Sequence, residues 1–277
     1  MYKKQISAKV KIACLYLLRF PCYNKRKKRK GRTQILKAEI TYLDNSGFAV
    51  KTERHFLIFD CWNNRPESGK KGLAGGVIDP EELKKENVFV FVSHAHADHF
   101  NKMIFAWQEQ IKDIHYIVSS DVSRANGATI VQPGQEYAVQ DVTFKTLRST
   151  DEGVAFLVKV DGLTIYHAGD LNWWHWEGED PQWNSDMARD YKKEIDRLIG
   201  EKIDIAFVPV DPRLGESLLW GLTYFMQTVG ARIVFPIHYG SAGSVAAQAI
   251  RMAEEPCVHG GKIVLPMQRG ETVTWEG

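Results

Sequence analysis

The 277-residue chain has few cysteines and no long apolar run. Its four cysteines, at positions 14, 22, 61 and 257, form no Cys-x-x-Cys pair, which excludes a disulfide framework and a cysteine-based zinc site. No stretch approaches the roughly 20 apolar residues that a membrane-spanning helix needs, so we expect no membrane span. Because few cysteines are typical of a reducing compartment, we expect a cytoplasmic protein.

Acidic residues are missing from the first 32 positions, which hold twelve Lys or Arg and no Asp or Glu. The net charge of +2 therefore divides into +12 for this segment and −10 for the remaining residues. We expect a basic N-terminal extension, residues 1–34, and one folded domain, residues 35–277. Three interpretations of the extension stay open: a disordered or artefactual segment, a contact with nucleic acid or an anionic membrane, and an atypical export signal.

The domain begins with short β-branched runs and continues with strands that alternate with helical patterns. Residues 88–92, VFVFV, are apolar throughout, as expected of a buried strand. We expect helices at about residues 100–110, 185–200, 216–230 and 244–255, and a strand over 136–147. A strand-rich first part followed by alternating elements predicts a layered α/β domain.

The densest group of polar residues follows the 88–92 strand. Three of the nine histidines lie within six residues there, as His94, His96 and His99, together with Asp98. Alternation at a strand end places His94 and His96 on one side, and the following turn can bring Asp98 and His99 to the same point. Imidazole nitrogens and carboxylate oxygens are ligands for Zn, Fe and Mn. The pattern predicts one or two bound divalent ions, with zinc as the first choice and Mn or Fe as alternatives.

Residues 93–99, SHAHADH, resemble the His-x-His-x-Asp-His signature of the metallo-β-lactamase-fold hydrolase superfamily. Three further positions follow that family's order: Asp60 in FLIFDCW, Asp170 in IYHAGD and His238 in VFPIHYG. The resemblance covers residues 36–277 and implies the α/β fold class, as a four-layer αβ/βα sandwich. It also implies that Asp60 supports the metal loop, that Asp170 bridges two metals and that His238 is the last ligand.

One histidine of the family pattern is missing from the segment before Asp170, where this chain has LRSTDEG. Asp151 is the candidate replacement, with a water or His175 as alternatives. The short HAGD and PIH segments are most similar to the ascorbate-6-phosphate lactonase-like branch, which normally keeps that histidine. The resemblance assigns His94, His96 and the missing ligand to a first metal, and Asp98, His99 and His238 to a second, with Asp170 shared.

These ligands point to hydrolysis. A divalent ion lowers the pKa of a bound water toward about 7, and Asp98 could orient the attacking water as well as bind metal. We therefore expect a metal-dependent hydrolase acting on a small-molecule ester, lactone, amide or phosphoester. An RNA-processing nuclease of the same fold and a non-catalytic metal-binding protein are the alternatives. The charge of −10 after residue 32 weighs against nucleic acid, except through the basic extension.

Candidate substrate-binding residues follow the predicted metal ligand Asp170. We expect Trp173, Trp174 and His175 to meet substrate, because flat aromatic walls suit rings and apolar groups. These tryptophans could instead seal the gap between loop and core. Arg213 is expected either to pair with an anionic substrate group or to form a salt bridge within its own turn.

Overall fold

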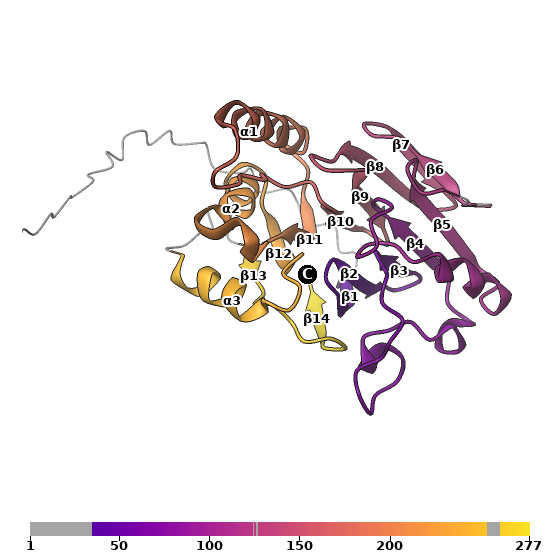
Figure 1. Cartoon of the computed structure of the whole chain (residues 1–277). Coiled ribbons are helices and arrows are strands. Elements are labelled where there is room, and N and C mark those ends of the chain that lie inside the picture. The colour runs from indigo at the N-terminus through magenta and orange to yellow at the C-terminus, as the bar shows by residue number, and fades with distance from the viewer. Residues whose placement is uncertain (1–34, 124, 126, 254–260) are drawn as a thin grey trace, which may run out of the picture. The chain divides into compact units, whose positions relative to one another are not determined.

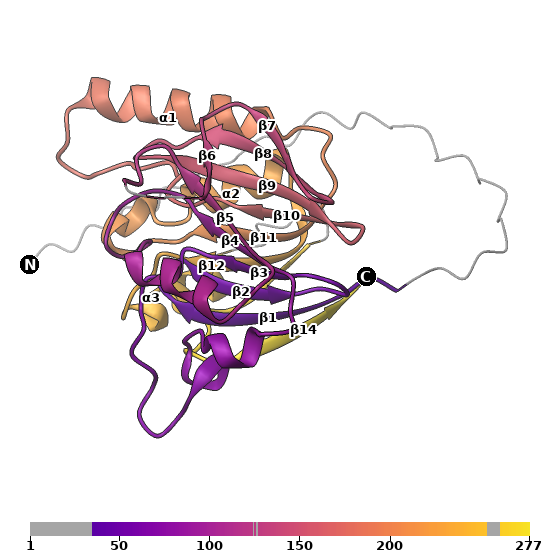
Figure 2. The ribbon, with the colours of Figure 1, turned by 90° about the vertical axis from the view of Figure 1, so that its right-hand side faces the viewer.

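The computed structural model describes residues 35–277 apart from 124, 126 and 254–260. The expectations for residues 1–34 lie outside the described residues. Figures 1 and 2 show two β-sheets that pack against each other, each with seven strands in the described part of the chain. No helix in this part is both long and apolar enough to cross a membrane.

The first sheet joins the beginning and the end of the domain, because β14 pairs with β1. The pairs from β14 to β3 are antiparallel, and those from β3 to β6 are parallel. Its strands, in spatial order, are β14 (Thr272–Glu276), β1 (Lys37–Asp44), β2 (Gly47–Lys51), β3 (Phe56–Phe59), β4 (Val88–Val92), β5 (Ile114–Ser119) and β6 (Thr129–Val131).

The second sheet has the same division into an antiparallel and a parallel part. Strands β7 to β10 form an antiparallel meander, and β10 to β13 are parallel. Its strands, in spatial order, are β13 (Lys262–Ile263), β12 (Ala231–Ile237), β11 (Ile203–Pro209), β10 (Leu163–His167), β9 (Val154–Val160), β8 (Val142–Arg148) and β7 (Glu136–Val139).

Helical layers cover both sheets, as the expected four-layer sandwich requires. Phe225 of α2 stacks on Tyr166 of β10 in the second sheet, and Tyr191 of α1 donates a hydrogen bond to the carbonyl of Gly221 in α2. Short 3₁₀ helices pack on the first sheet instead. The helices are α1 (Pro181–Asp196), α2 (Trp220–Thr228), α3 (Gly243–Met252), η1 (Gly72–Gly75), η2 (Pro80–Leu83), η3 (Lys102–Glu109) and η4 (Pro212–Ser217).

Strand β4 explains why the run before the histidine motif is apolar throughout. Phe89 and Phe91 belong to the core between the sheets, where Phe91 meets Phe144 and Phe156 of the second sheet. The alternating valines belong to the other core, beneath the 3₁₀ helices. Both faces of β4 are therefore buried, and the strand ends where the polar residues begin.

Four predicted elements differ from the structure. The expected helix at 216–230 is α2, which begins four residues late, after the separate 3₁₀ helix η4. The expected helix at 100–110 is the 3₁₀ helix η3, whose buried Ile104 and Trp107 have the three-residue spacing of that helix. The expected strand over 136–147 is a hairpin, because Gln140 takes a left-handed backbone conformation. Helix α1 begins four residues early at Pro181, since Asp180 caps it with two accepted backbone hydrogen bonds.

Candidate metal centre

Parallel strands of both sheets end around one point. Asp60 follows β3, residues 93–99 follow β4, and Asp211 and His238 come shortly after β11 and β12. Asp170 stands three residues beyond β10. The carboxyl ends of parallel strands are the usual location of a site in α/β sheets. The structure thus gathers residues that are far apart in sequence.

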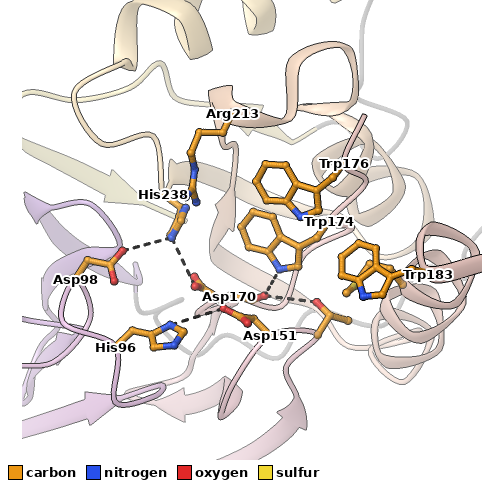
Figure 3. A pocket seen from close by; sticks show the side chains of 11 residues that line it. His96, Asp98, Asp151, Asp170, Trp174, Trp176, Trp183, Arg213 and His238 are labelled. Atoms are coloured by element: carbon orange, nitrogen blue, oxygen red, sulfur yellow. Dashed lines mark hydrogen bonds and ion pairs between the residues drawn. The ribbon is translucent and has the colours of Figure 1, made fainter. Parts of the chain in front are cut away.

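Two groups of metal-ligating side chains form at this edge, and Figure 3 shows several of them around one pocket. In each group the ligand atoms lie within 4.8 Å of one another. All seven residues predicted as metal ligands belong to one or the other. The first group is His94, His96, Asp151 and Asp170, and the second group is Asp98, His99 and His238.

Asp60 organises the histidines behind the site. Its buried carboxylate accepts hydrogen bonds from the backbone N and the Oγ of Ser93, at 2.7 and 2.6 Å, and from Nδ1 of His99, at 2.8 Å. Because the Ser93 hydroxyl donates to Asp60, it accepts from Nδ1 of His94, at 2.9 Å. Both imidazoles therefore turn Nε2 toward the site, where Nε2 of His94 lies 3.0 Å from Nδ1 of His96. Burial opposes the charge of Asp60, yet the hydrogen bond from His99 and the neighbouring histidines lower its pKa.

His238 is oriented in the same way by Asp211. Its Nδ1 lies 3.1 Å from the buried Asp211 carboxylate, which leaves Nε2 to face Asp98 and Asp170. Burial works against the charged form, but hydrogen bonds from His238 and Arg213 lower the pKa of Asp211 to about 2. A carboxylate behind a ligating imidazole is the usual support for a metal-bound histidine. His238 also has a positive φ of 62°, and strain of this kind is concentrated at functional sites.

Most distances between the imidazoles and the carboxylates of the site suit a shared cation better than direct hydrogen bonds. Nε2 of His238 lies 3.5 Å from Asp170 and 3.6 Å from Asp98, and Nε2 of His99 lies 3.7 Å from Asp98. In the first group, Nε2 of His94 lies 3.5 Å from Asp170. Two atoms bound at about 2.1 Å to one tetrahedral ion are about 3.4 Å apart, whereas hydrogen bonds are shorter than about 3.2 Å.

Buried polar atoms without a hydrogen bond provide a second indication that cations fit here. Nε2 of His99 and Oδ1 of Asp170 are buried, lie 3.2 Å apart and have no hydrogen-bond partner. Burial opposes both charges, yet the Asp170 charge raises the pKa of His99 well above its usual value, and His99 lowers the pKa of Asp170. A divalent ion would satisfy both atoms and displace the proton from His99. The residues present therefore fit metal ions.

A pocket of about 310 Å³ opens over the two groups (Figure 3). Trp174 donates its indole N–H to the carbonyl of Asp170 at 2.9 Å and stacks parallel to Trp176, with ring centres 6.1 Å apart. Arg213 lies over Trp176 and forms the salt bridge within its own turn, with Asp211, while its pairing with an anionic substrate group stays a prediction. The lining residues are His96, Asp98, Thr150, Asp151, Asp170, Trp174, Trp176, Trp183, Met187, Arg213 and His238.

Two predicted substrate-binding residues do not line this pocket. Trp173 packs against Trp220 and against Tyr191 of α1, and Lys192 sits 4.1 Å above its ring. His175 lies against Trp220, with ring centres 4.6 Å apart, and belongs to neither metal-ligating group. The physical reason is that Trp174 turns toward Asp170, so its sequence neighbours point the other way.

Sequence reasoning missed two residues that hold the site together. Asn45, in the β1–β2 turn, donates its side-chain N–H to Asp98 at 2.9 Å, and its carbonyl accepts from the backbone N of His238. Asn184 of α1 binds the backbone of Trp176 through both ends of its amide. In the sequence, Asn45 is an ordinary turn residue and Asn184 an ordinary helix residue, so no sequence pattern indicates that either contacts the site.

Comparison with known proteins places this geometry in a family. A model of the beta-lactamase superfamily domain matches residues 39–238. The chain belongs to this superfamily. The sequence-based expectation of the superfamily is thereby confirmed, and so is the expected fold.

Relatives and solved structures agree with this assignment. A UPF0173 metal-dependent hydrolase from Bacillus velezensis is 26% identical over 85% of this chain and 98% of its own length. One from Methanospirillum hungatei is 29% identical over 60% of this chain and 75% of its own length. Igni18, a metallo hydrolase from Ignicoccus hospitalis, has the same fold, with a TM-score of 0.58 and 18% identity over 87% of this chain and 99% of its own length. The metallo-beta-lactamase fold protein YhfI from Bacillus subtilis matches with a TM-score of 0.54 and 14% identity, over 87% of this chain and 100% of its own length.

Proposed function

We propose that this member of the superfamily is a metal-dependent hydrolase of a small-molecule ester, lactone, amide or phosphoester. The observation that carries the proposal is the pair of ligand groups at the floor of a pocket, with three buried imidazoles whose Nδ1 atoms are already engaged. The names of the curated relatives support the same class of reaction.

The residues of the site have different roles in metal binding and in water orientation. His94, His99 and His238 present Nε2 toward the site, and Asp170 lies between the two groups. When bound, a divalent ion supplies a Lewis acid and lowers the pKa of a nearby water. Asp98, half exposed to the pocket and fixed by Asn45, is placed to orient the attacking water and to accept its proton.

The pocket favours a small substrate with a planar or apolar part and an anionic part. Its volume lies at the lower end of the range of about 300–1,000 Å³ found for ligand pockets. Stacked Trp174 and Trp176 offer a flat wall. Arg213 uses Nε and Nη2 on Asp211, which leaves Nη1 for a carboxylate or phosphate.

Three further expectations are part of the proposal. The ions are one or two in number, with zinc as the first choice and Mn or Fe as alternatives. The domain comprises residues 35–277, after a basic extension over 1–34. The location is the cytoplasm, in keeping with Cys61, which is free and buried and is the one cysteine among the described residues.

A panel of generic substrates tests the proposal. Full-length protein loaded with zinc or manganese is assayed on p-nitrophenyl esters, lactones, bis-p-nitrophenyl phosphate and single-stranded RNA. We expect hydrolysis of a small substrate that EDTA abolishes and that His94→Ala lowers by about 1,000-fold, because removing a member of a catalytic unit costs several kcal/mol.

The matched control is His115→Ala, which removes a histidine that pairs with Asp113 far from the ligand groups. This variant should keep the activity of the unmodified protein. Cleavage of RNA alone would favour the nuclease. Metal binding without activity on any substrate would favour a non-catalytic protein.

A further inference from the structure

The turn between β8 and β9 stands where the family pattern has its missing histidine, and it is pressed against the metal loop. The backbone N of Val154 donates to the carbonyl of Ser93 at 2.9 Å. Gly153 has a φ of +69°, and a Cβ on it would lie 2.0 Å from that carbonyl and 2.7 Å from Cβ of His94. Only glycine permits this approach, so the turn is fixed next to the first ligand group.

The other side of the turn is tied to the loop after Asp170. The Thr150 hydroxyl donates to the carbonyl of Asn172 at 2.6 Å and accepts from the backbone N of Asn172 at 3.0 Å. The backbone N of Asp151 donates to Oγ of Ser149 at 3.1 Å. The backbone of Asp151 is thus held from both sides, and its side chain, 46% exposed, extends from this fixed position.

The Asp151 carboxylate faces the first group. Its Oδ2 lies 3.7 Å from Nδ1 of His96, which itself lies 3.0 Å from Nε2 of His94. A separation of 3.7 Å is too long for a hydrogen bond and close to the spacing of two ligands on one ion. With Asp170, the first group contains two imidazoles and two carboxylates. The second group has the same donor types when the neighbouring Asp170 is counted.

We propose that Asp151 is a metal ligand that replaces the missing histidine and admits Mn²⁺ or Fe²⁺ to the first group in competition with Zn²⁺. This inference rests on the metal centre of the proposed function. A carboxylate in place of an imidazole adds a negative charge and an oxygen donor, and oxygen ligands suit Mn²⁺ better than imidazole does. Three carboxylates, those of Asp98, Asp151 and Asp170, then face the charge of the bound ions.

Metal binding to the full-length protein tests the inference without an activity assay. Chelator-treated protein is titrated with Mn²⁺ and, separately, with Zn²⁺ in calorimetry, and the bound metal is counted by mass spectrometry. We expect two equivalents of Mn²⁺ for the unmodified protein and one for Asp151→Asn. Asp151→His should bind two equivalents of Zn²⁺, with a Zn²⁺-over-Mn²⁺ selectivity at the first group at least tenfold higher than in the unmodified protein.

Asp113→Asn is the matched control, because Asp113 is an exposed carboxylate paired with a histidine outside the site. Circular dichroism confirms folding, and Asp151→Ser repeats the deletion with a smaller side chain. Two tightly bound Mn²⁺ ions in Asp151→Asn and Asp151→Ser would overturn the ligand role, even if hydrolysis is intact. Unchanged selectivity in Asp151→His would overturn the effect on metal choice. Asp151-dependent Mn²⁺ binding in a protein without hydrolase activity would support this inference and contradict the proposed function.

Discussion

Two clusters of histidine and aspartate lie at opposite ends of the same strands. The site cluster follows the ends of β3 and β10, whereas a second cluster, formed by His55, Asp141, Asp161 and Arg54, precedes their starts. We call the second cluster the closed cluster, because both nitrogens of His55 lie 2.9 Å from a carboxylate. In the site cluster, Nδ1 of His99 and of His238 is within 3.1 Å of a carboxylate, but each Nε2 is 3.2–3.7 Å from the next one.

The comparison shows that residue types alone do not identify a metal site. His55 is as buried as His99 and has two carboxylate neighbours, against three for His99, and both of its nitrogens are hydrogen-bonded. His99 keeps one buried nitrogen without a hydrogen bond, facing an equally unpartnered oxygen of Asp170. The unsatisfied nitrogen, rather than the number of nearby carboxylates, marks the place for a cation.

The largest effect in this comparison is expected from Asp211, which supports a ligand without facing the metal. Asp211→Asn removes the charge that holds Nδ1 of His238, so metal affinity should fall about 10–100-fold. Competition with a chromogenic chelator measures this change. The control is Asp141→Asn in the closed cluster, which should leave metal affinity unaltered. Equal losses in both variants would show that the two clusters do not differ as described.

Sequence reasoning succeeds where a motif lies on one strand end. Residues 93–99 can be recognised as one motif because β4, which is buried on both faces, ends directly before the histidines. The more distant ligands are found through the resemblance to the superfamily, whose order of positions they follow, and in the structure each comes after a strand of the parallel part of a sheet. Asp151 is the exception, because it lies in an antiparallel hairpin and reaches the site only through the close approach of Gly153.

The substrate side was less predictable for a physical reason. In this loop Trp174 binds the carbonyl of Asp170, whereas its two sequence neighbours pack against the ring of Trp220. Trp176 is held by Asn184, which belongs to a helix that begins after the loop. Contacts between a loop and an element that follows it are not encoded in the local pattern, so the tryptophan-rich segment could not be divided into pocket and core residues in advance.

A smaller effect is expected from Arg213, which lies beside the site cluster, and it can be compared with the effect of Arg54 in the closed cluster. Arg213→Met should raise KM about tenfold, or about 1.4 kcal/mol, for mono-p-nitrophenyl glutarate, because the anionic group loses its partner. KM for neutral p-nitrophenyl butyrate and the metal content should stay unchanged. Arg54→Met is the control, since Arg54 pairs with Asp161 in the closed cluster. A parallel rise in KM for both esters would contradict anion recognition.

The smallest effect on the site, and a purely structural one, is expected from Asp161. Burial opposes its charge, yet hydrogen bonds from His55, Thr52 and Arg54 lower the pKa of Asp161 to about 2. Asp161→Asn should therefore lower the free energy of unfolding by about 2 kcal/mol at pH 7, measured in urea. Because the folded pKa lies below the unfolded value of about 3.9, this stabilisation is present above pH 4 and is lost as the pH falls toward about 2.

Metal content of the Asp161→Asn variant should not change, since the closed cluster has no unsatisfied nitrogen to share with a cation. A variant that loses metal but keeps its stability would mean that the two ends of these strands are functionally coupled.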